Sequence, residues 1–152
     1  MPITKGIRQL IQEAMDQVTT YSVDEVRARA DDPTLVLVDI RDVRELAAEG
    51  TAVNCIHAPR GMLEFWVDPE SPYFKPVFAD ESKEYVLYCG AGWRSALATK
   101  SLQEMGMTNV AHIDGGFFNG IHRLLNVGII DMADKIDKED ISPIARWRRA
   151  GL

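Results

Sequence analysis

The segment 85–98, with the sequence YVLYCGAGWRSALA, restricts the fold of this chain more than any other stretch. Its first residues are apolar or aromatic without a helical period, which predicts a buried strand. Ser95 precedes a run rich in Ala and Leu and predicts the N-cap of a helix. Cys89 follows the strand directly, and Gly90 and Gly92 supply the residues of a tight turn. A cysteine therefore lies where a strand ends and a helix begins.

Strands and helices alternate around this segment. Aliphatic runs predict further strands at 35–38, 53–57 and 110–113. A capping box at Ser22 and Glu25 opens a helix that ends before Asp32, and further helices are predicted at 43–48, at 61–66 and from the Cys89 turn to about Met105. This order predicts an α/β domain with a mostly parallel sheet and helices on both faces. In such sheets, active sites lie beyond the carboxyl ends of strands, where Cys89 is expected.

Residues 1–20 carry apolar side chains at three- and four-residue steps, which predicts an amphipathic helix ahead of the main domain. We expect this helix to pack on the core of the domain. A contact between two subunits of a homodimer is the alternative.

Cys89 has the surroundings of a thiolate nucleophile. Unpaired amides at a helix N-terminus and in a glycine turn form an anion site, and Arg94 adds a full positive charge. These features stabilise a sulfur anion and favour its reactivity. The alternative is that Cys89 is a small buried hydrophobe, as most free cysteines are.

The Cys89 loop resembles the active-site loop of the single-domain rhodaneses, which are thiosulfate and persulfide sulfurtransferases. The resemblance rests on seven consecutive residues: Cys89, Gly90, Ala91, Gly92, Trp93, Arg94 and Ser95. Three further segments resemble family signatures in the family's order, at 37–45, 56–66 and 112–117. The resemblance spans 21–117 and implies a rhodanese-like α/β fold over that core.

The resemblance also implies a function. Cys89 would be the catalytic nucleophile, and the other six loop residues would bind the substrate. Arg60 would either bind the donor anion or pair with Glu64 one helical turn later. Sulfur would pass from thiosulfate or a persulfide, through a Cys89 persulfide, to cyanide, a thiol or a carrier protein. This chemistry requires no cofactor and no metal.

The chain departs from the family pattern in two places. The segment 50–55 lacks the usual proline and histidine and contains a second cysteine, Cys55, of open role. After Phe117, the residues 118–145 resemble an insertion, which we expect to form one or two helices packed on the domain or on a second subunit. The segment 146–152 resembles the closing segment of the family.

Composition and charge argue against several other classes of protein and of binding site. A net charge of -6 argues against nucleic-acid binding, and no run approaches the ~20 apolar residues of a membrane helix. The N-terminus lacks the hydrophobic core of a signal peptide, and two cysteines make no disulfide framework, so we expect a cytoplasmic protein. The three histidines are dispersed, which argues against a zinc site, and none is an obvious base for Cys89.

Two other functions stay open. A cysteine-dependent phosphatase would use the same nucleophile and arginine, although related phosphatase loops hold five residues between them and this chain holds four. A rhodanese-like interaction module without catalysis is the third possibility, although such modules usually lack the cysteine.

Asp39 and Arg41 lie at the end of a predicted strand. We expect this pair to tie loops together rather than to act in catalysis.

Overall fold

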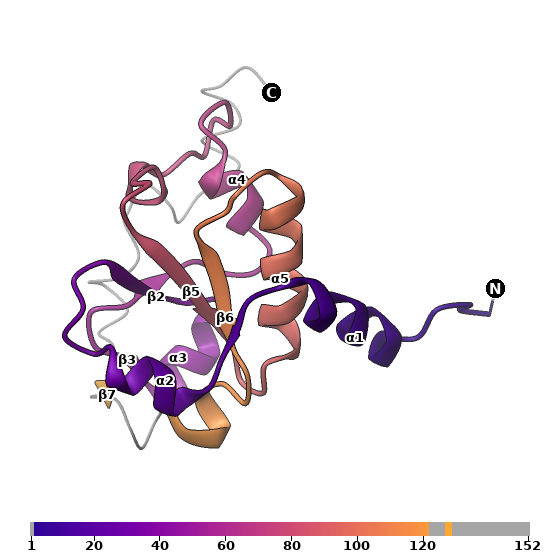
Figure 1. The fold of residues 1–152 in the computed structure, drawn as a ribbon, viewed down its shortest axis with the longest axis horizontal. Coiled ribbons are helices and arrows are strands. Elements are labelled where there is room, and N and C mark those ends of the chain that lie inside the picture. Colours follow the sequence, from indigo (N-terminus) through magenta and orange to yellow (C-terminus); the bar gives the residue numbers. More distant parts are fainter. Residues whose placement is uncertain (1, 122–126, 129–152) are drawn as a thin grey trace.

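The computed structural model describes residues 2–121 and 127–128 of the chain, and Figure 1 shows their arrangement. At its centre lies a five-stranded sheet with the strand order β1-β6-β5-β2-β4, in which every neighbouring pair is parallel. The predicted α/β class with a parallel sheet is confirmed. Most of the predicted insertion at 118–145, and all of the closing segment at 146–152, lie outside the described residues.

Two of the predicted strands extend one residue beyond their predicted bounds, and the strand at 110–113 has the predicted bounds. β2 (Leu35–Asp39) and β5 (Glu84–Tyr88) form the longest pairing, with Leu35 opposite Glu84 and Asp39 opposite Tyr88. β6 (Val110–Ile113) lies on the other side of β5, and β1 (Thr20–Tyr21) pairs with β6 at the edge of the sheet. The carboxyl ends of these parallel strands meet at one edge, where Cys89 follows β5.

The predicted strand at 53–57 is wrong in its bounds. Only β4 (Ile56–His57) joins the main sheet, next to β2. β3 (Thr51–Ala52) pairs instead with β7 (Val127–Gly128) in a separate antiparallel pair. Asn54 has a positive φ of 62°, a conformation that asparagine tolerates better than most residues, and it turns the chain between the two short strands.

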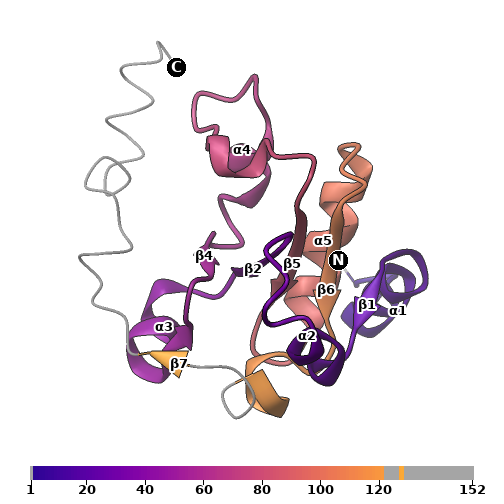
Figure 2. The same ribbon diagram turned by 60° about the vertical axis from the view of Figure 1, so that its left-hand side comes forward.

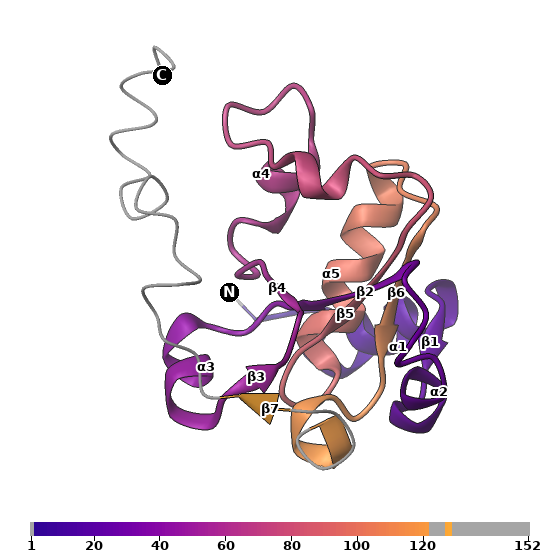
Figure 3. The ribbon, with the colours of Figure 1, turned by 90° about the vertical axis from the view of Figure 1, so that its left-hand side faces the viewer.

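Helices cover both faces of the sheet (Figures 2 and 3). α5 (Trp93–Glu104) and α4 (Leu63–Val67) lie on one face, and α1 (Ile7–Gln17) packs beside α5. The opposite face carries α2 (Val23–Ala28), α3 (Val43–Glu49) and the short helix η2 (Phe117–Ile121). A 3-10 turn, η1 (Pro76–Phe78), lies in the proline-rich connection between α4 and β5.

Successive side chains of β5 alternate between two hydrophobic clusters. Tyr85 and Leu87 face α4 and α5, whereas Val86 and Tyr88 face α2 and η2. All four are fully buried, which explains why this strand reads as a continuous apolar run. The alternation places Cys89 on the α5 face, together with Tyr85 and Leu87.

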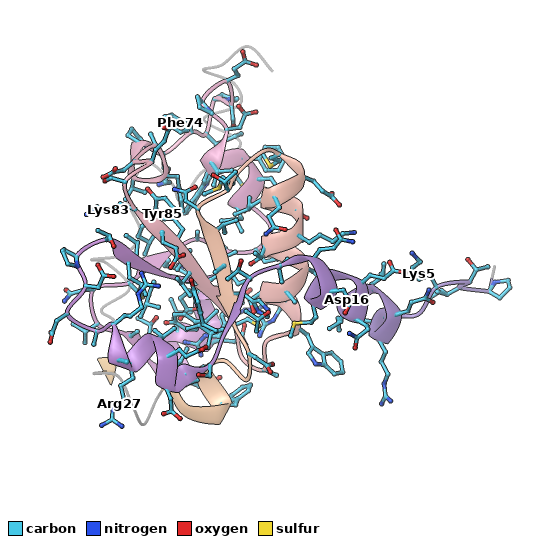
Figure 4. The ribbon with its side chains drawn as sticks, viewed as in Figure 1. Lys5, Asp16, Arg27, Phe74, Lys83 and Tyr85 are labelled. Carbon is cyan, nitrogen blue, oxygen red and sulfur yellow. The ribbon has the colours of Figure 1, made fainter. Side chains whose placement is uncertain are left out.

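The N-terminal helix α1 is partly buried. It packs on α5, and its Ala14 is fully buried. Ile3 and Ile7 are 83% and 51% exposed, so part of the apolar stripe faces solvent. Figure 4 shows Lys5 and Asp16 pointing outward from this N-terminal arm. The homodimer contact proposed for this stripe stays a prediction. Among residues 2–121 and 127–128, no helix is both long and apolar enough to cross a membrane.

Candidate active site

Cys89 lies in a loop of backbone amides at the end of β5. Its side chain is 1% exposed, and the N–H groups of Gly92 and Ser95 donate to Sγ at 3.2 and 3.4 Å. Both amides belong to the start of α5, where the first N–H groups have no partner within the helix. The sulfur therefore occupies the position of an anion bound at a helix N-terminus.

The predicted N-cap of this helix is wrong. Gly92, with a φ of 99°, is the N-cap, and Ser95 is the third residue inside the helix. The left-handed conformation of Gly92 turns the chain sooner than a serine cap would allow, because glycine adopts positive φ without steric cost. As a result, Ser95 contributes its backbone amide to Cys89 instead of capping the helix with its hydroxyl.

The segment that follows β6 is bonded to the Cys89 loop through the backbone. Phe117 N–H donates to the carbonyl of Cys89 at 2.8 Å, and Phe118 N–H donates to the carbonyl of Gly90 at 2.9 Å. Gly116 makes this approach feasible, because a Cβ at that position would overlap the Cys89 carbonyl oxygen, and its φ of 54° is positive. The segment 112–117, which was expected only from its resemblance to a family signature, therefore has a physical role in supporting the loop.

Arg94 is held by a glutamate from α3. Its two terminal nitrogens donate to Glu45 at 2.8 and 2.9 Å, which is the bidentate geometry of a strong ion pair. The same carboxylate accepts from Asp42 N–H and completes the capping box of α3. The Arg94 guanidinium lowers the pKa of Glu45, while Glu45 above all, and Cys89 in smaller measure, raise the pKa of Arg94. The loop cation is therefore fixed in place and largely neutralised.

The other predicted binding residues lie in different positions around the loop. Ala91 and Trp93 are exposed, and Trp93 is 52% exposed. Phe118 is also exposed, and its ring edge comes close to Gly90. The two aromatic side chains therefore border the loop on its solvent side. Arg60 donates to Glu64 at 2.6 Å, so its role toward a donor anion stays a prediction.

His112 reaches the site through Ser95, a connection that the sequence did not lead us to expect. Its Nδ1 lies 3.0 Å from Ser95 Oγ, and Ser95 Oγ lies 3.6 Å from Cys89 Sγ. The ring is completely buried on β6, and burial lowers the pKa of His112 to about 4. A signal was present in the sequence, because a histidine in the apolar strand 110–113 must find hydrogen-bond partners in the core.

Cys55 lies on the opposite face of the sheet from Cys89. Its Sγ is 3.1 Å from Thr51 Oγ1 and 3.8 Å from the hydroxyl of Tyr88, and both cysteines are thiols rather than halves of a disulfide. Cys55 and Tyr88 belong to the cluster beneath α2 and η2, whereas Cys89 belongs to the cluster beneath α4 and α5. The sheet therefore separates the two sulfurs, which opposes a disulfide between them.

Asp39 and Arg41 form a buried pair on the Cys55 face, with both side chains fully buried. Arg41 donates to Asp39 at 2.8 Å and to the carbonyl of Gly50 at 2.7 Å, and Thr51 donates to Asp39 at 2.6 Å. Burial opposes the charge of Arg41, but the hydrogen bonds that Arg41 donates to Asp39 outweigh it and raise the pKa of Arg41. The pair ties the end of β2 to the 50–51 segment, as the sequence predicted.

Comparison with known protein families gives the family of this chain. The model of the rhodanese-like domain family matches residues 22–121, which is more than half of the chain. The protein belongs to the rhodanese-like domain family. The parallel sheet with its helices is the rhodanese fold.

This chain is similar to one curated protein in sequence and to two solved structures in fold. The tRNA uridine(34) hydroxylase of Erwinia tasmaniensis is 30% identical over 131 residues, which cover 84% of this chain and 35% of that protein. A Rhodopseudomonas palustris protein of unknown function, described as a possible tyrosine phosphatase, has a TM-score of 0.79 at 41% identity over 84% of this chain and 98% of its own. The human single-domain sulfurtransferase TSTD1 has a TM-score of 0.57 at 26% identity over 68% of this chain and 96% of its own.

The rhodanese-like chain spans about a third of the length of the curated hydroxylases that it matches. Its family and its sulfurtransferase neighbour support a sulfurtransferase-like function. Within the described ranges, no group of three or more His, Cys, Asp or Glu side chains could hold a metal ion.

Proposed function

We propose that this protein is a sulfurtransferase that carries sulfane sulfur as a persulfide on Cys89. The donor is thiosulfate or a persulfide, and the acceptor is cyanide, a thiol or a carrier protein. The observation that carries the proposal is the pair of N–H groups, from Gly92 and Ser95, that donate to Cys89 Sγ at 3.2 and 3.4 Å. These donors stabilise a negative charge on the sulfur directly.

The reaction follows from this geometry in two steps. The Cys89 thiolate attacks the outer sulfur of thiosulfate, the sulfur–sulfur bond of the donor breaks, and sulfite leaves with the bonding electron pair. The new persulfide bond, about 2.05 Å long, places an anionic terminal sulfur beyond Sγ. An acceptor nucleophile then attacks that sulfur, and the Cys89 thiolate leaves with the electron pair. Loop amides stabilise the anion before and after each transfer.

The charged groups of the loop suit the transfer of a sulfur atom. Glu45 occupies both terminal nitrogens of Arg94, so the guanidinium holds the loop rather than presenting an empty fork to a dianion. Arg60, paired with Glu64, is the residue we propose to bind the sulfonate end of thiosulfate by exchanging that partner. Trp93 and Phe118 would shield the persulfide from water.

A cysteine-dependent phosphatase is the second candidate. The description of the Rhodopseudomonas palustris relative as a possible tyrosine phosphatase favours it. Two observations oppose it: only four residues separate Cys89 from Arg94, and the fork of Arg94 is occupied by Glu45. A tight loop with a neutralised arginine is a poor receptor for a phosphate dianion.

Hydroxylation of a tRNA uridine is the activity named for the curated relatives, which are much longer proteins. The net charge of -6 gives this chain no electrostatic attraction for RNA, so we do not extend that activity to it. A reducing compartment such as the cytoplasm is part of the proposal, because Cys89 must be a free thiol to accept sulfur.

Intact mass before and after incubation with thiosulfate tests the proposal. We expect a gain of one sulfur, about 32 Da, in the wild type and in Cys55→Ala but not in Cys89→Ala, and cyanide should remove it. The same proteins are then assayed for hydrolysis of p-nitrophenyl phosphate. A sulfur gain that survives in Cys89→Ala would overturn the proposal. Absence of any gain together with Cys89-dependent phosphate hydrolysis would transfer the assignment to the phosphatase.

A further inference from the structure

A chain of three side chains leads from β1 to the reactive sulfur. Thr20 Oγ1 lies 3.0 Å from His112 Nε2, and His112 Nδ1 lies 3.0 Å from Ser95 Oγ, which is 3.6 Å from Cys89 Sγ. Thr20 and His112 are direct partners in the pairing of β1 with β6, so the register of two parallel strands brings them together. Thr20 lies before the family-matched range 22–121.

The direction of the hydrogen bonds in this chain follows from the chemistry of a neutral imidazole. Complete burial keeps His112 uncharged, since it lowers its pKa to about 4. A neutral imidazole has one donor nitrogen and one acceptor nitrogen. Because the Ser95 hydroxyl donates to the carbonyl of Gly92 at 3.2 Å, it accepts from His112, so Nδ1 carries the proton. Nε2 then accepts from the hydroxyl of Thr20 at 3.0 Å, and the other acceptor near that hydroxyl, Met15 Sδ, lies farther away at 3.9 Å. The hydrogen of Ser95 is therefore available to acceptors other than His112.

Ser95 has two acceptors within reach for that hydrogen. Its hydroxyl can donate to the carbonyl of Gly92 at 3.2 Å, and it lies 3.6 Å from Cys89 Sγ. While Cys89 is a thiol, S–H donates to Ser95 Oγ and the Ser95 hydrogen points to Gly92. When the sulfur is an anion, rotation of the hydroxyl alone turns the hydrogen toward Sγ. The anion then has a third donor beside the two backbone amides.

We propose that Thr20 and His112 are positioning residues that orient the Ser95 hydroxyl toward the anionic sulfur of Cys89. The N-terminal β1 is thereby part of the active site and not only an edge strand of the sheet. The inference rests on the proposed function only in requiring that Cys89 act as an anion, whatever the donor. The alternative is that His112 is a core histidine whose two nitrogens are merely satisfied.

The test is the rate at which iodoacetamide alkylates Cys89, measured as a function of pH in a Cys55→Ala background. Ser95→Ala should lower the rate at neutral pH about tenfold, as expected from loss of one hydrogen bond to a charged group. Thr20→Val should lower it in the same direction by about threefold, since it weakens the hold on Ser95 only indirectly. Thr20→Ser keeps the hydroxyl and should restore the wild-type profile.

Thr99→Val is the matched control. Thr99 is a fully buried threonine in α5 whose hydroxyl donates to the carbonyl of Ala111 and not to His112. We expect Thr99→Val to change the melting temperature without moving the pH profile. The ionisable groups nearest the loop, Arg94 with Glu45 and Asp114 beside Gly92, are unchanged in every variant. A Thr20→Val profile that superimposes on that of wild type would overturn the proposal.

Nitrogen-15 NMR of the His112 ring in the wild type gives an answer even where a variant fails to fold. Neutral imidazole signals distinguish a proton on Nδ1 from one on Nε2. We expect the proton on Nδ1 at neutral pH, and a proton on Nε2 would overturn the proposal. Sulfur loading is recorded on the same samples, so that an altered alkylation profile without any gain from thiosulfate would count against the proposed function alone.

Discussion

Each face of the central sheet buries a cysteine among polar groups, and the two environments differ. On the α5 face, Cys89 Sγ accepts from two backbone amides at the start of a helix. On the opposite face, Cys55 lies beside the hydroxyls of Thr51 and Tyr88, which also bond to each other at 2.8 Å. Both residues are buried to a similar extent, so burial does not separate a nucleophile from a packing cysteine. The two cysteines differ in the kind of group beside the sulfur: backbone N–H groups at a helix N-terminus donate to Cys89, whereas side-chain hydroxyls lie beside Cys55.

Two charged pairs also differ, one on the Cys55 face and one that links α3 to the Cys89 loop. Asp39 and Arg41 are fully buried and are bound to the backbone and to Thr51. Glu45 and Arg94 have side chains 27% and 42% exposed, at the border of the loop. The buried pair stabilises the fold, whereas the partly exposed pair fixes Arg94 at the border of the loop. Matched substitutions in the two pairs can test this division.

Two glycines give the largest expected difference. Gly116 and Gly106 both have positive φ, of 54° and 102°, but only at Gly116 would an added Cβ overlap the backbone, at the Cys89 carbonyl oxygen. Gly116→Ala should therefore displace the Cys89 loop, abolish sulfur loading and destabilise the protein by about 4 kcal/mol. Gly106→Ala has open space and should cost about 1 kcal/mol, from its backbone conformation alone.

Urea unfolding and the thiosulfate mass gain check this pair of variants. Equal stability losses would mean that positive φ, and not the close approach to Cys89, explains the glycine at 116. Normal sulfur loading in folded Gly116→Ala would mean that the loop tolerates a shift, which would contradict a site that depends on fixed amides.

The two ion pairs give the next largest difference. Asp39→Asn leaves the buried charge of Arg41 with only the more distant Glu49, at 3.7 Å, as counter-charge and should destabilise the fold by about 3 kcal/mol, while the folded molecules still load sulfur. Glu45→Gln keeps the capping box of α3, since glutamine also serves there, and should change stability by less than about 1 kcal/mol. It frees the charge of Arg94, so the KM for thiosulfate should fall about threefold through stronger anion attraction.

Chemical denaturation and steady-state sulfur transfer to cyanide measure both effects. A Glu45→Gln protein as unstable as Asp39→Asn would show that the Arg94 pair is structural like the other. A rise in KM in Glu45→Gln would show that Glu45 serves the donor by holding Arg94 in place, and not by neutralising it.

The features that sequence could predict are those set by neighbours along the chain. The strand at 110–113 and the capping box of Ser22 and Glu25 were correct, because apolar runs and caps act over a few residues. The Cys89 loop was located by its glycines and by its resemblance to a family. Its two amide donors follow from the strand–turn–helix order alone.

The features that sequence could not predict depend on contacts between distant segments. β3 pairs with β7, which lies far along the chain, so the 53–57 run gave no sign of a break near Asn54. The cap at Gly92 depends on a φ of 99°, which the pattern of residues at the helix start did not require. His112 joins the site only through the register of β1 with β6, which no local pattern encodes.

Lowering the pH should give the smallest of the expected differences, because it should reduce the stability that the Cys89 face contributes through His112. Burial lowers the pKa of His112 from its ordinary 6.5 to about 4, so between these values the unfolded chain binds a proton that the folded protein does not. Stability should therefore fall as pH falls through this window, by about 2 kcal/mol at pH 5. On the other face, Arg41 and Tyr88 have raised pKa values and keep their protons throughout, so these two groups contribute no slope.

Urea midpoints from pH 7 to pH 4.5, for the wild type and for His112→Asn, measure this contribution. The pKa values of Asp32 and Asp42 are both lowered to about 2, so their stabilising interactions persist across the window and are lost only in stronger acid. The slope should therefore be present in the wild type and strongly reduced in His112→Asn. An equal slope in the two proteins would assign the acid sensitivity to other groups and would mean that His112 is charged inside the folded protein, in which case Nδ1 and Nε2 would both donate and the hydroxyl of Thr20 would have to accept.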